Sequence, residues 1–240
     1  MEEFKKILYR ACGDIGLTLT DHETDLFMRY YEELILWNQK MSLVSIKSPL
    51  DIPKHVIDSL TVTKCIANER SRLLDIGTGA GLPGIPLKIT MDSLRVTLLD
   101  SSRKKVSFLK NIVRKLELTN VSVVNGRAEV LTAEEHFKDS FDVVISRAAF
   151  KMPVLLTLGE AFLSDGGILI AMKGKNADAE LRDAADVVRK KGLALIDRHE
   201  ITLPITGESR KILCFNRRRQ HTDKQDLQSG KRGAVSNYRF

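Results

Sequence analysis

The sequence predicts an α/β fold in which a mainly parallel sheet follows a helical extension. From about residue 70, short apolar runs alternate with helical segments, as they do when strands are buried between two helical layers. The first run leads into a loop dense in glycine, DIGTGAGLPGIP, at residues 75–86. Residues 1–67, by contrast, have helical periodicity. We therefore predict a helical extension over 1–67 and a sheet domain over 68–216.

The extension is predicted to contain three amphipathic helices. Phe4, Leu8 and Ala11 share one face of the first helix. The second begins at a capping box, Thr20-Asp21-His22-Glu23, whose two outer side chains each accept a hydrogen bond from the other's backbone amide. Ser48-Pro49 breaks the pattern before the third helix. None of these residues carries cofactor chemistry, so we interpret the extension as a cap or a substrate-side element.

The sheet domain is predicted to contain seven strands. Five apolar runs are typical of buried parallel strands. The last two runs are separated only by Pro204-Ile205-Thr206-Gly207, which is too short for a crossover helix, so they should form an antiparallel hairpin. The runs lie at residues 72–75, 94–100, 121–124, 141–146, 167–172, 193–203 and 210–216.

The glycine loop after the first strand is typical of a site for a nucleotide-like cofactor, and two patterns fit it. Residues 79–84 match the G-x-G-x-x-G of dinucleotide folds. An acidic-x-G-x-G-x-G pattern, as in S-adenosylmethionine (SAM) enzymes, runs from Asp75 through Gly77 and Gly79 to Gly81. SAM has an amino-acid end instead of a pyrophosphate, and a strand-end carboxylate suits its ammonium. Asp75 thus favours the Rossmann-like sheet of class I SAM methyltransferases; a tight turn without a ligand is the alternative.

Polar residues follow the second and third strands. Asp100 ends the second, where an acidic residue accepts hydrogen bonds from ribose hydroxyls; capping the next helix is a compatible alternative. Asn125-Gly126-Arg127-Ala128-Glu129 follows the third strand, at the level that borders the adenine of a cofactor. A simple turn with a helix cap is the alternative there.

The segment after the fourth strand, Ser146-Arg147-Ala148-Ala149-Phe150, is where methyltransferases place their acceptor chemistry. It lacks the Asp/Asn-Pro-Pro-aromatic motif that serves exocyclic amines, and no cysteine is near to form a covalent pyrimidine adduct. Arg147 suits a carboxylate or a phosphate, unless it is only a surface arginine. These absences are consistent with a ring nitrogen whose lone pair needs no general base, so we name no catalytic base.

Two further places are candidates for contacts with the substrate. Lys173 ends the fifth strand at the same sheet edge, where it either touches phosphate or extends to solvent. His55 and Asp58, three residues apart, share a face of the third helix, and such a pair is more often a packing contact than a site.

Composition bounds the remaining possibilities. The net charge is +7, and residues 216–240 hold seven Lys/Arg against two Asp, so 217–240 is predicted to be a disordered basic tail that either binds a polyanion such as RNA or only aids solubility. The three scattered cysteines predict neither a metal site nor a disulfide framework. With no bilayer-spanning apolar run and no signal peptide, we expect a cytoplasmic protein without membrane contact. Nothing demands a dimer, so a monomer is expected.

Taken together, these segments resemble the RsmG (GidB) family of bacterial small-subunit rRNA methyltransferases. The resemblance runs from about Trp37-Asn38 to Arg210, over most of the chain. Its most specific parts are the Gly-Leu-Pro-Gly-Ile-Pro continuation of the glycine loop and the Ser-Arg-Ala after the fourth strand. The matching segments, in order, are His55-x-x-Asp58-Ser59, DIGTGAGLPGIPLKI (75–89), LLDSSRKKVSFL (98–109), GRAE (126–129), FDVVISRA (141–148) and MKG (172–174).

The resemblance implies SAM-dependent methylation of guanine N7 in 16S rRNA, in the conserved stem-loop near the decoding site of the 30S subunit. It places SAM contacts at Gly77, Leu82, Ala128, Glu129 and Arg147. His55, Asp58, Lys173 and Arg210 are the candidates for contacts with RNA or substrate.

Three alternatives remain open at this point. The first is a SAM methyltransferase that acts on a small molecule or a protein, which the basic tail and the family motifs disfavour. The second is a non-catalytic rRNA-binding assembly factor, which the intact Asp75, Gly77, Gly79 and Asp100 disfavour. The last is an NAD dehydrogenase, for which no catalytic domain follows the sheet.

Overall fold

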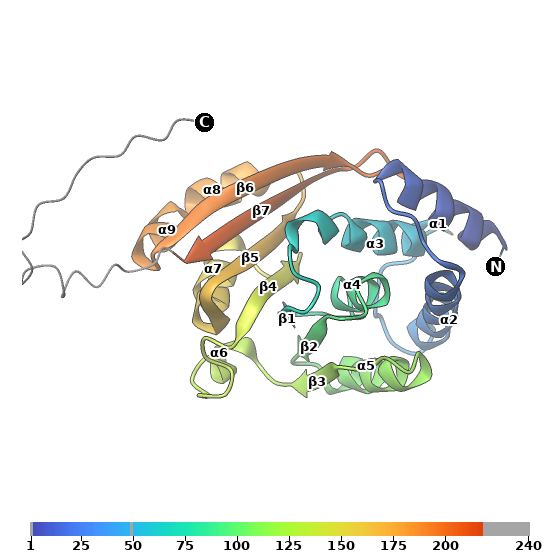
Figure 1. The fold of residues 1–240 in the computed structure, drawn as a ribbon, viewed down its shortest axis with the longest axis horizontal. Coiled ribbons are helices and arrows are strands. Elements are labelled where there is room, and N and C mark those ends of the chain that lie inside the picture. The colour runs from blue at the N-terminus through green and yellow to red at the C-terminus, as the bar shows by residue number, and fades with distance from the viewer. Residues whose placement is uncertain (1, 49, 218–240) are drawn as a thin grey trace, which may run out of the picture.

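The computed structural model describes residues 2–48 and 50–217 and contains a seven-stranded sheet flanked by helices (Figure 1). The strand order is β3-β2-β1-β4-β5-β7-β6. Strands β1 to β5 run parallel to one another, whereas β7 is antiparallel to both of its neighbours, β5 and β6. The predicted seven-stranded sheet with its final antiparallel hairpin is thus confirmed.

The strand boundaries agree with the apolar runs to within a few residues, and the largest difference is an earlier start of β5. The strands are β1 (Arg72–Ile76), β2 (Arg95–Asp100), β3 (Val121–Asn125), β4 (Phe141–Arg147), β5 (Leu163–Lys173), β6 (Leu193–Thr202) and β7 (Ser209–Arg217).

The helices of the extension come first, and the others mainly connect the strands of the sheet. The helices are α1 (Glu2–Asp14), α2 (Asp21–Asn38), α3 (Asp51–Leu60), the short 3-10 helix η1 (Thr63–Cys65), α4 (Gly84–Thr90), α5 (Arg103–Lys115), α6 (Ala128–Leu131), α7 (Met152–Phe162), α8 (Ala177–Asp183) and α9 (Ala185–Lys190).

Alternation along the strands builds one hydrophobic core on each face of the sheet. Leu73 of β1 and Val143 of β4 belong to a core with α1 to α5, whereas their neighbours Leu74 and Val144 belong to a second core with α6 to α9. Side chains of a strand alternate between its two faces, so a strand covered on both sides is apolar at nearly every position. This explains why the apolar runs located the strands.

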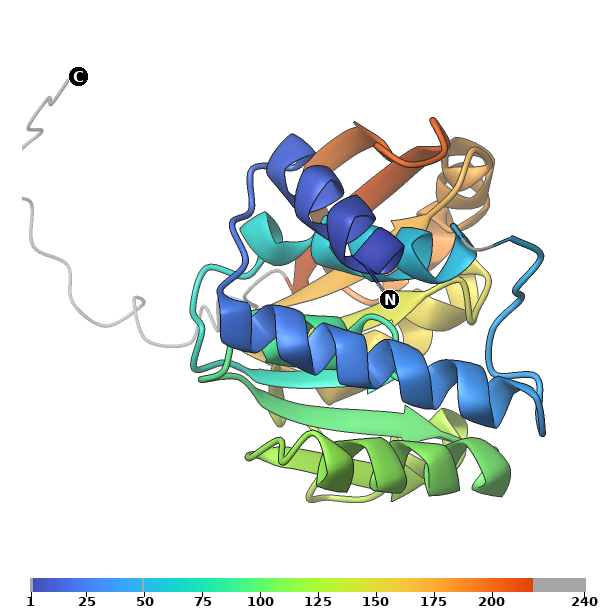
Figure 2. The ribbon, with the colours of Figure 1, turned by 90° about the vertical axis from the view of Figure 1, so that its right-hand side faces the viewer.

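The N-terminal helices pack on the same core as α4 and α5, and Figure 2 shows α1 and α2 lying over this side of the sheet. The capping box at α2 is present, with the Thr20 hydroxyl accepting a hydrogen bond from Glu23 N at 3.2 Å. Tyr30 of α2 is fully buried, and its hydroxyl donates to the Ala80 carbonyl at 2.7 Å. The extension therefore touches the glycine loop directly.

The parallel strands β1 to β5 all end at the same edge of the sheet, so the last residues of these five strands lie along that edge. These ends are Ile76, Asp100, Asn125, Arg147 and Lys173. In register, Asp100 is paired with Asn125 and Arg147 with Met172. In open α/β sheets ligands bind outside such carboxyl ends.

At the end of the described residues, Arg217 closes β7 and pairs with Asp139 at 2.7 Å. The rest of the predicted basic tail lies outside the described residues. Among the helices that the structure describes, none combines the length and apolarity needed to cross a bilayer.

Candidate functional site

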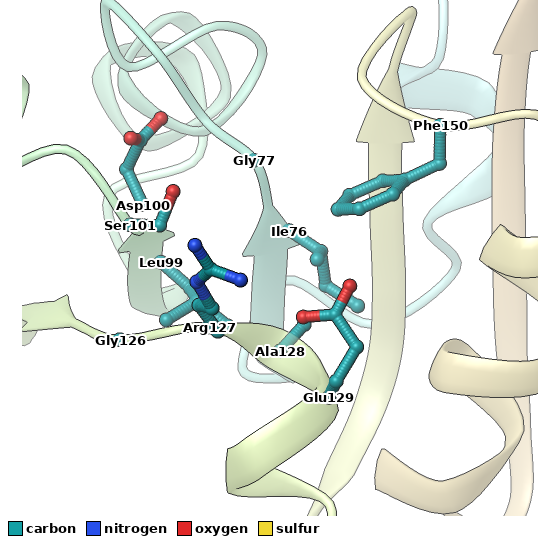
Figure 3. A pocket seen from close by; sticks show the side chains of 10 residues that line it. All are labelled: Ile76, Gly77, Leu99, Asp100, Ser101, Gly126, Arg127, Ala128, Glu129 and Phe150. Carbon is teal, nitrogen blue, oxygen red and sulfur yellow. The ribbon is translucent and has the colours of Figure 1, made fainter.

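A cavity of about 220 Å³ opens at the carboxyl ends of β1, β2 and β3 (Figure 3). Apolar side chains form part of its wall, and a carboxylate stands at either side of Arg127 in the view. It is lined by Ile76, Gly77, Leu99, Asp100, Ser101, Gly126, Arg127, Ala128, Glu129 and Phe150.

Asp100 is placed on this wall by a set of backbone hydrogen bonds. Its Oδ2 accepts from Gly79 N at 2.9 Å and its Oδ1 from Ser102 N at 2.8 Å. Each carboxylate oxygen can accept two hydrogen bonds, so both keep capacity for a ligand hydroxyl. The helix cap itself is provided by Ser102, which accepts from Lys105 N. Asp100 thus orients the glycine loop and remains able to accept from a ribose.

Asp75, by contrast, is fully buried beneath the glycine loop and does not line the cavity. Its Oδ2 accepts from Thr78 Oγ1 at 2.6 Å and from Gly84 N at 2.8 Å, which ties the end of β1 to the start of α4. Its Oδ1 is buried without a hydrogen-bond partner among the described residues. Burial raises the pKa of this carboxyl to about 6. Its expected contact with the ammonium of SAM stays a prediction.

The loop glycines serve different purposes. Gly77 lines the cavity at φ +71°, and a Cβ there would lie 2.6 Å from Ala149 Cβ. Gly79, at φ +61°, is more open, with Gly77 O and Lys105 Nζ 4.0 Å from such a Cβ. Gly81 instead allows α4 to pack closely against the loop, because a Cβ at this position would lie 2.4 Å from Ile85 Cγ1. Leu82 is buried and lies outside the cavity wall.

Ala128 and Glu129 form the cavity wall below β3, as the first turn of the short helix α6. Ala128 is buried whereas Glu129 is exposed, with its carboxylate toward the cavity (Figure 3). Asn125 Nδ2 donates to the Asp100 carbonyl at 3.1 Å, which holds the ends of β2 and β3 together. This segment offers backbone groups and a small side chain to a flat ring.

Phe150 is a cavity residue that sequence reasoning did not single out, and Figure 3 shows its ring facing Ile76. Lys173 fixes the loop that carries it: its buried Nζ donates to the Phe150 carbonyl at 2.5 Å and to Glu180 Oε2 at 2.7 Å. Glu180 Oε2 also accepts from Met152 N at 3.0 Å. In the structure Lys173 therefore stabilises the loop that carries Phe150 through hydrogen bonds. An aromatic residue three positions after Arg147 was the only available signal for Phe150.

The remaining candidates meet in one cluster. Asp58 of α3 accepts from Arg147 Nη1 of β4 at 3.2 Å and from Arg210 Nε of β7 at 3.2 Å. Arg147 Nη1 also lies 3.3 Å from His55 Nδ1. Residues separated by up to 152 positions in the sequence are thus brought together at the sheet edge.

Burial, together with the charge of Arg147, lowers the pKa of His55 to about 4. The imidazole is therefore neutral at pH 7. Because a guanidinium can only donate, Nδ1 of His55 acts as the acceptor in its contact with Arg147. The positive charge of this cluster comes from the two arginines.

Tyr30 is the second functional residue that the sequence did not indicate. Beyond its bond to Ala80, burial raises the pKa of its phenol, and the charges of Arg147 and Asp75 act on the same group. It supports the glycine loop from the side of the extension. In the sequence, Tyr30 lies at helical spacing between Leu26 and Leu34, which indicates only a core residue.

The site residues fit a nucleoside with an anionic appendage better than a metal. The cavity combines an accepting carboxylate, apolar walls and a glycine cradle, and a guanidinium lies at the end of the neighbouring strand. Within residues 2–48 and 50–217, no cluster of three or more His, Cys, Asp or Glu side chains has a metal-binding arrangement. The cysteines Cys12, Cys65 and Cys214 are free thiols.

Comparison with known proteins gives a consistent family. The family model described as rRNA small subunit methyltransferase G, GidB, matches residues 23–204. The chain is 44% identical over 214 residues to the Ribosomal RNA small subunit methyltransferase G of Syntrophus aciditrophicus, covering 88% of this chain and 89% of that protein. It is 35% identical over 230 residues to the protein of that name from Acetivibrio thermocellus, covering 95% of each.

Solved structures share the fold at low sequence identity. M. jannaschii TYW2 in complex with AdoMet aligns with a TM-score of 0.54 and 19% identity, covering 72% of this chain and 78% of that one. A SAM-dependent methyltransferase from Aquifex aeolicus aligns with a TM-score of 0.55 and 15% identity, covering 78% and 97%. The predicted class I methyltransferase sheet is confirmed.

Substituting Gly77→Ala should weaken binding of the methylation product S-adenosylhomocysteine. The new Cβ must displace Ala149 or Phe150 at the cavity, besides straining the positive φ. Gly166→Ala is the matched control: Gly166 has φ +74° with nothing within 4 Å of a Cβ, so it carries only the strain, about 1–2 kcal/mol. Calorimetric titration and thermal unfolding separate the two effects. Equal affinity in Gly77→Ala and Gly166→Ala would contradict the placement of the site.

Replacing Asp75 with Asn should change how stability depends on pH. Since the folded-state pKa of about 6 exceeds the ordinary value, the stabilisation from the protonated carboxyl is complete below about pH 4 and lost as the pH rises through 6. The free energy of unfolding of the wild type, minus that of Asp75→Asn, should fall by about 2–3 kcal/mol across this window. Urea denaturation at several pH values measures the difference, with the exposed Asp25→Asn as control. A constant difference would show that burial does not perturb Asp75.

Proposed function

Because the chain belongs to the GidB family, rRNA small subunit methyltransferase G, we propose that it transfers the methyl group of SAM to N7 of a specific guanine in 16S rRNA. Family membership makes it a SAM-dependent methyltransferase of small-subunit rRNA. The observation that carries the finer proposal is the acceptor segment after β4. There Arg147 is followed by Ala148, Ala149 and Phe150, none of which can take up a proton.

The residues proposed to hold SAM lie on both sides of Gly77. Asp100 would accept from the ribose hydroxyls, and Ala128 with Glu129 would border the adenine. Arg147, at the end of the adjacent strand β4, would pair with the carboxylate of the amino-acid end. When bound, SAM supplies a methyl group on a sulfonium that an incoming lone pair displaces in line.

The acceptor side then requires positioning more than acid–base chemistry. The N7 lone pair of guanine would take the methyl group directly: the N–C bond would form as the S–C bond breaks, and no proton would leave the base. Bringing two groups together in a fixed orientation is itself a large contribution to rate. Lys173 and Glu180, which fix the Phe150 loop from behind, suit a site that works by orientation.

A polyanionic substrate is supported by the charge on α5. This helix carries six basic residues and no acidic one, and it begins two residues after the cavity residue Ser101. Arg103, Lys104 and Lys110 are exposed, and none of them forms an ion pair with a carboxylate of the described chain. Such a row attracts a phosphate backbone and gives binding a strong salt dependence. We therefore propose that the rRNA runs along α5 toward the sheet edge at which SAM is bound, in the cytoplasm, where ribosomal subunits are assembled.

The direct test is methylation of 16S rRNA in deproteinised form and in 30S subunits. With labelled SAM we expect one 7-methylguanosine, located by borohydride reduction and aniline cleavage, which cuts the RNA at such a base, and identified in a nucleoside digest by mass spectrometry. Label on an exocyclic amine or a pyrimidine would contradict the N7 proposal. Label reaching only protein or a metabolite would support the small-molecule or protein alternative, and SAM binding without transfer to any substrate would support an assembly factor.

Lys104→Ala should weaken RNA binding and reduce the slope of log affinity against log salt by about 0.7–0.9 for the lost phosphate contact. Affinity for S-adenosylhomocysteine should not change, because the side chain is exposed on α5 and does not line the cavity. Lys190→Ala is the control, since Lys190 is exposed on α9, on the opposite face of the sheet. Filter binding over a salt series gives the slope; equal slopes for the two variants would remove α5 from the RNA path.

A further inference from the structure

We propose that Asp58 is a positioning residue for the cofactor: it holds Arg147 so that the free edge of the guanidinium receives the carboxylate of the amino-acid end of SAM. This inference rests on the proposed function and concerns the part of the site that the nucleoside cavity does not cover. It gives the carboxylate of α3 a different task from the contact with RNA that the sequence indicated.

The first step is that Asp58 cannot meet RNA in this structure. The residue is only 3% exposed, and it lies between two guanidinium groups. Its Oδ2 accepts from Arg147 Nη1 at 3.2 Å, and both of its oxygens lie 3.2 Å from Arg210 Nε. A buried carboxylate in this position acts on its two partners, because removing it would leave Arg147 without a carboxylate and Arg210 with Glu208 alone.

The two arginines differ in which of their nitrogens have partners in the protein. Arg210 is committed to the protein with all three nitrogens: Nε donates to Asp58, Nη1 to the Ser209 carbonyl and Nη2 to Glu208 Oε2 at 2.7 Å. Each of its three nitrogens is therefore already held by an acceptor of the protein. Its role is to fix the Asp58 carboxylate from the side of β7.

Arg147 differs because only Nη1 is engaged, by Asp58 and by His55 Nδ1. Its Nε and Nη2 form no hydrogen bond with any residue that the structure describes, and neither is among the fully buried unpaired atoms. These two nitrogens form the parallel fork that binds a carboxylate with two hydrogen bonds. Asp58 and His55 occupy the other nitrogen and so set the rotation of the fork.

The fork of Arg147 lies near the glycine loop. Arg147 ends β4, the strand next to β1, and its charge acts on both Asp75 and Tyr30, which support the glycine loop. The nucleoside cavity occupies the ends of β1, β2 and β3. A ligand that extends from this cavity past Gly77 toward β4 brings its far end to Arg147. In SAM that far end is the amino acid.

The experiment compares two ligands that differ only in that end. S-adenosylhomocysteine has the amino-acid carboxylate, whereas 5′-methylthioadenosine keeps the nucleoside and thioether without it. For Asp58→Asn we expect the dissociation constant of S-adenosylhomocysteine to rise about 10-fold or more, the scale of a charged hydrogen bond that loses its geometry, and that of methylthioadenosine to stay within about 2-fold. Calorimetric titration of the full chain measures both.

Two further variants keep the test decisive. Glu208→Gln removes the other carboxylate on Arg210 without touching Arg147, so it should leave both affinities near those of the wild type. Arg147→Lys keeps the charge and the pairing with Asp58 but loses the fork, so it should repeat the selective loss of S-adenosylhomocysteine. If Asp58→Asn does not fold, Asp58→Glu, which keeps the charge but moves the carboxylate by one methylene, takes its place in the same comparison of the two ligands.

An equal loss of both ligands in Asp58→Asn would show a structural role only and overturn the inference. Unchanged S-adenosylhomocysteine binding, with weaker RNA binding in Asp58→Asn or Arg147→Lys, would also overturn it, because the fork would then serve a phosphate. If the wild type binds neither ligand, the proposed function itself fails, which distinguishes that failure from the failure of the positioning role.

Discussion

The site depends on one buried carboxylate at the first strand end. Asp75 Oδ2 accepts from Thr78 Oγ1 and Gly84 N, so a single oxygen joins the end of β1, the glycine loop and the start of α4. Its burial raises the pKa of the carboxyl to about 6, so at neutral pH the protein keeps a negative charge in a buried position. A buried charge is tolerated only where hydrogen bonds hold it. The hydrogen bonds that stabilise this anion therefore also hold the glycine loop in place.

From that fixed loop the site divides into two halves. On the side of β2 and β3, Asp100 uses its carboxylate to orient Gly79 and Ser102 and still faces the cavity. On the side of β4, Arg147 is anchored at one nitrogen by Asp58. In the proposed binding mode, accepting groups thus face the hydroxyls of the ligand and donating groups face its anionic end. Such preorganised polarity suits a transfer reaction that creates no proton to remove.

The N-terminal extension contributes residues to this arrangement, although it precedes the sheet in the sequence. Tyr30 supports the loop through Ala80, and α3 supplies both Asp58 and His55 to the end of β4. The extension shares one hydrophobic core with α4, α5 and the adjacent face of the sheet. Its packing therefore sets the geometry of Arg147, which links the stability of the extension to the proposed cofactor site.

The sequence alone determined the sheet, because strands covered on both faces must be apolar along their length and the short Pro204–Gly207 link forbids a crossover. It also located the strand-end positions, since parallel strands end at one edge, and the specific motifs indicated the family. Only the tertiary structure decided what these side chains do. It buried Asp75 under the loop, put Lys173 behind Phe150, and brought Asp58 to Arg147 and Arg210. The physical reason is that spacing along a chain fixes which face or edge a residue occupies, whereas burial and hydrogen-bond partners arise from elements up to 154 positions away.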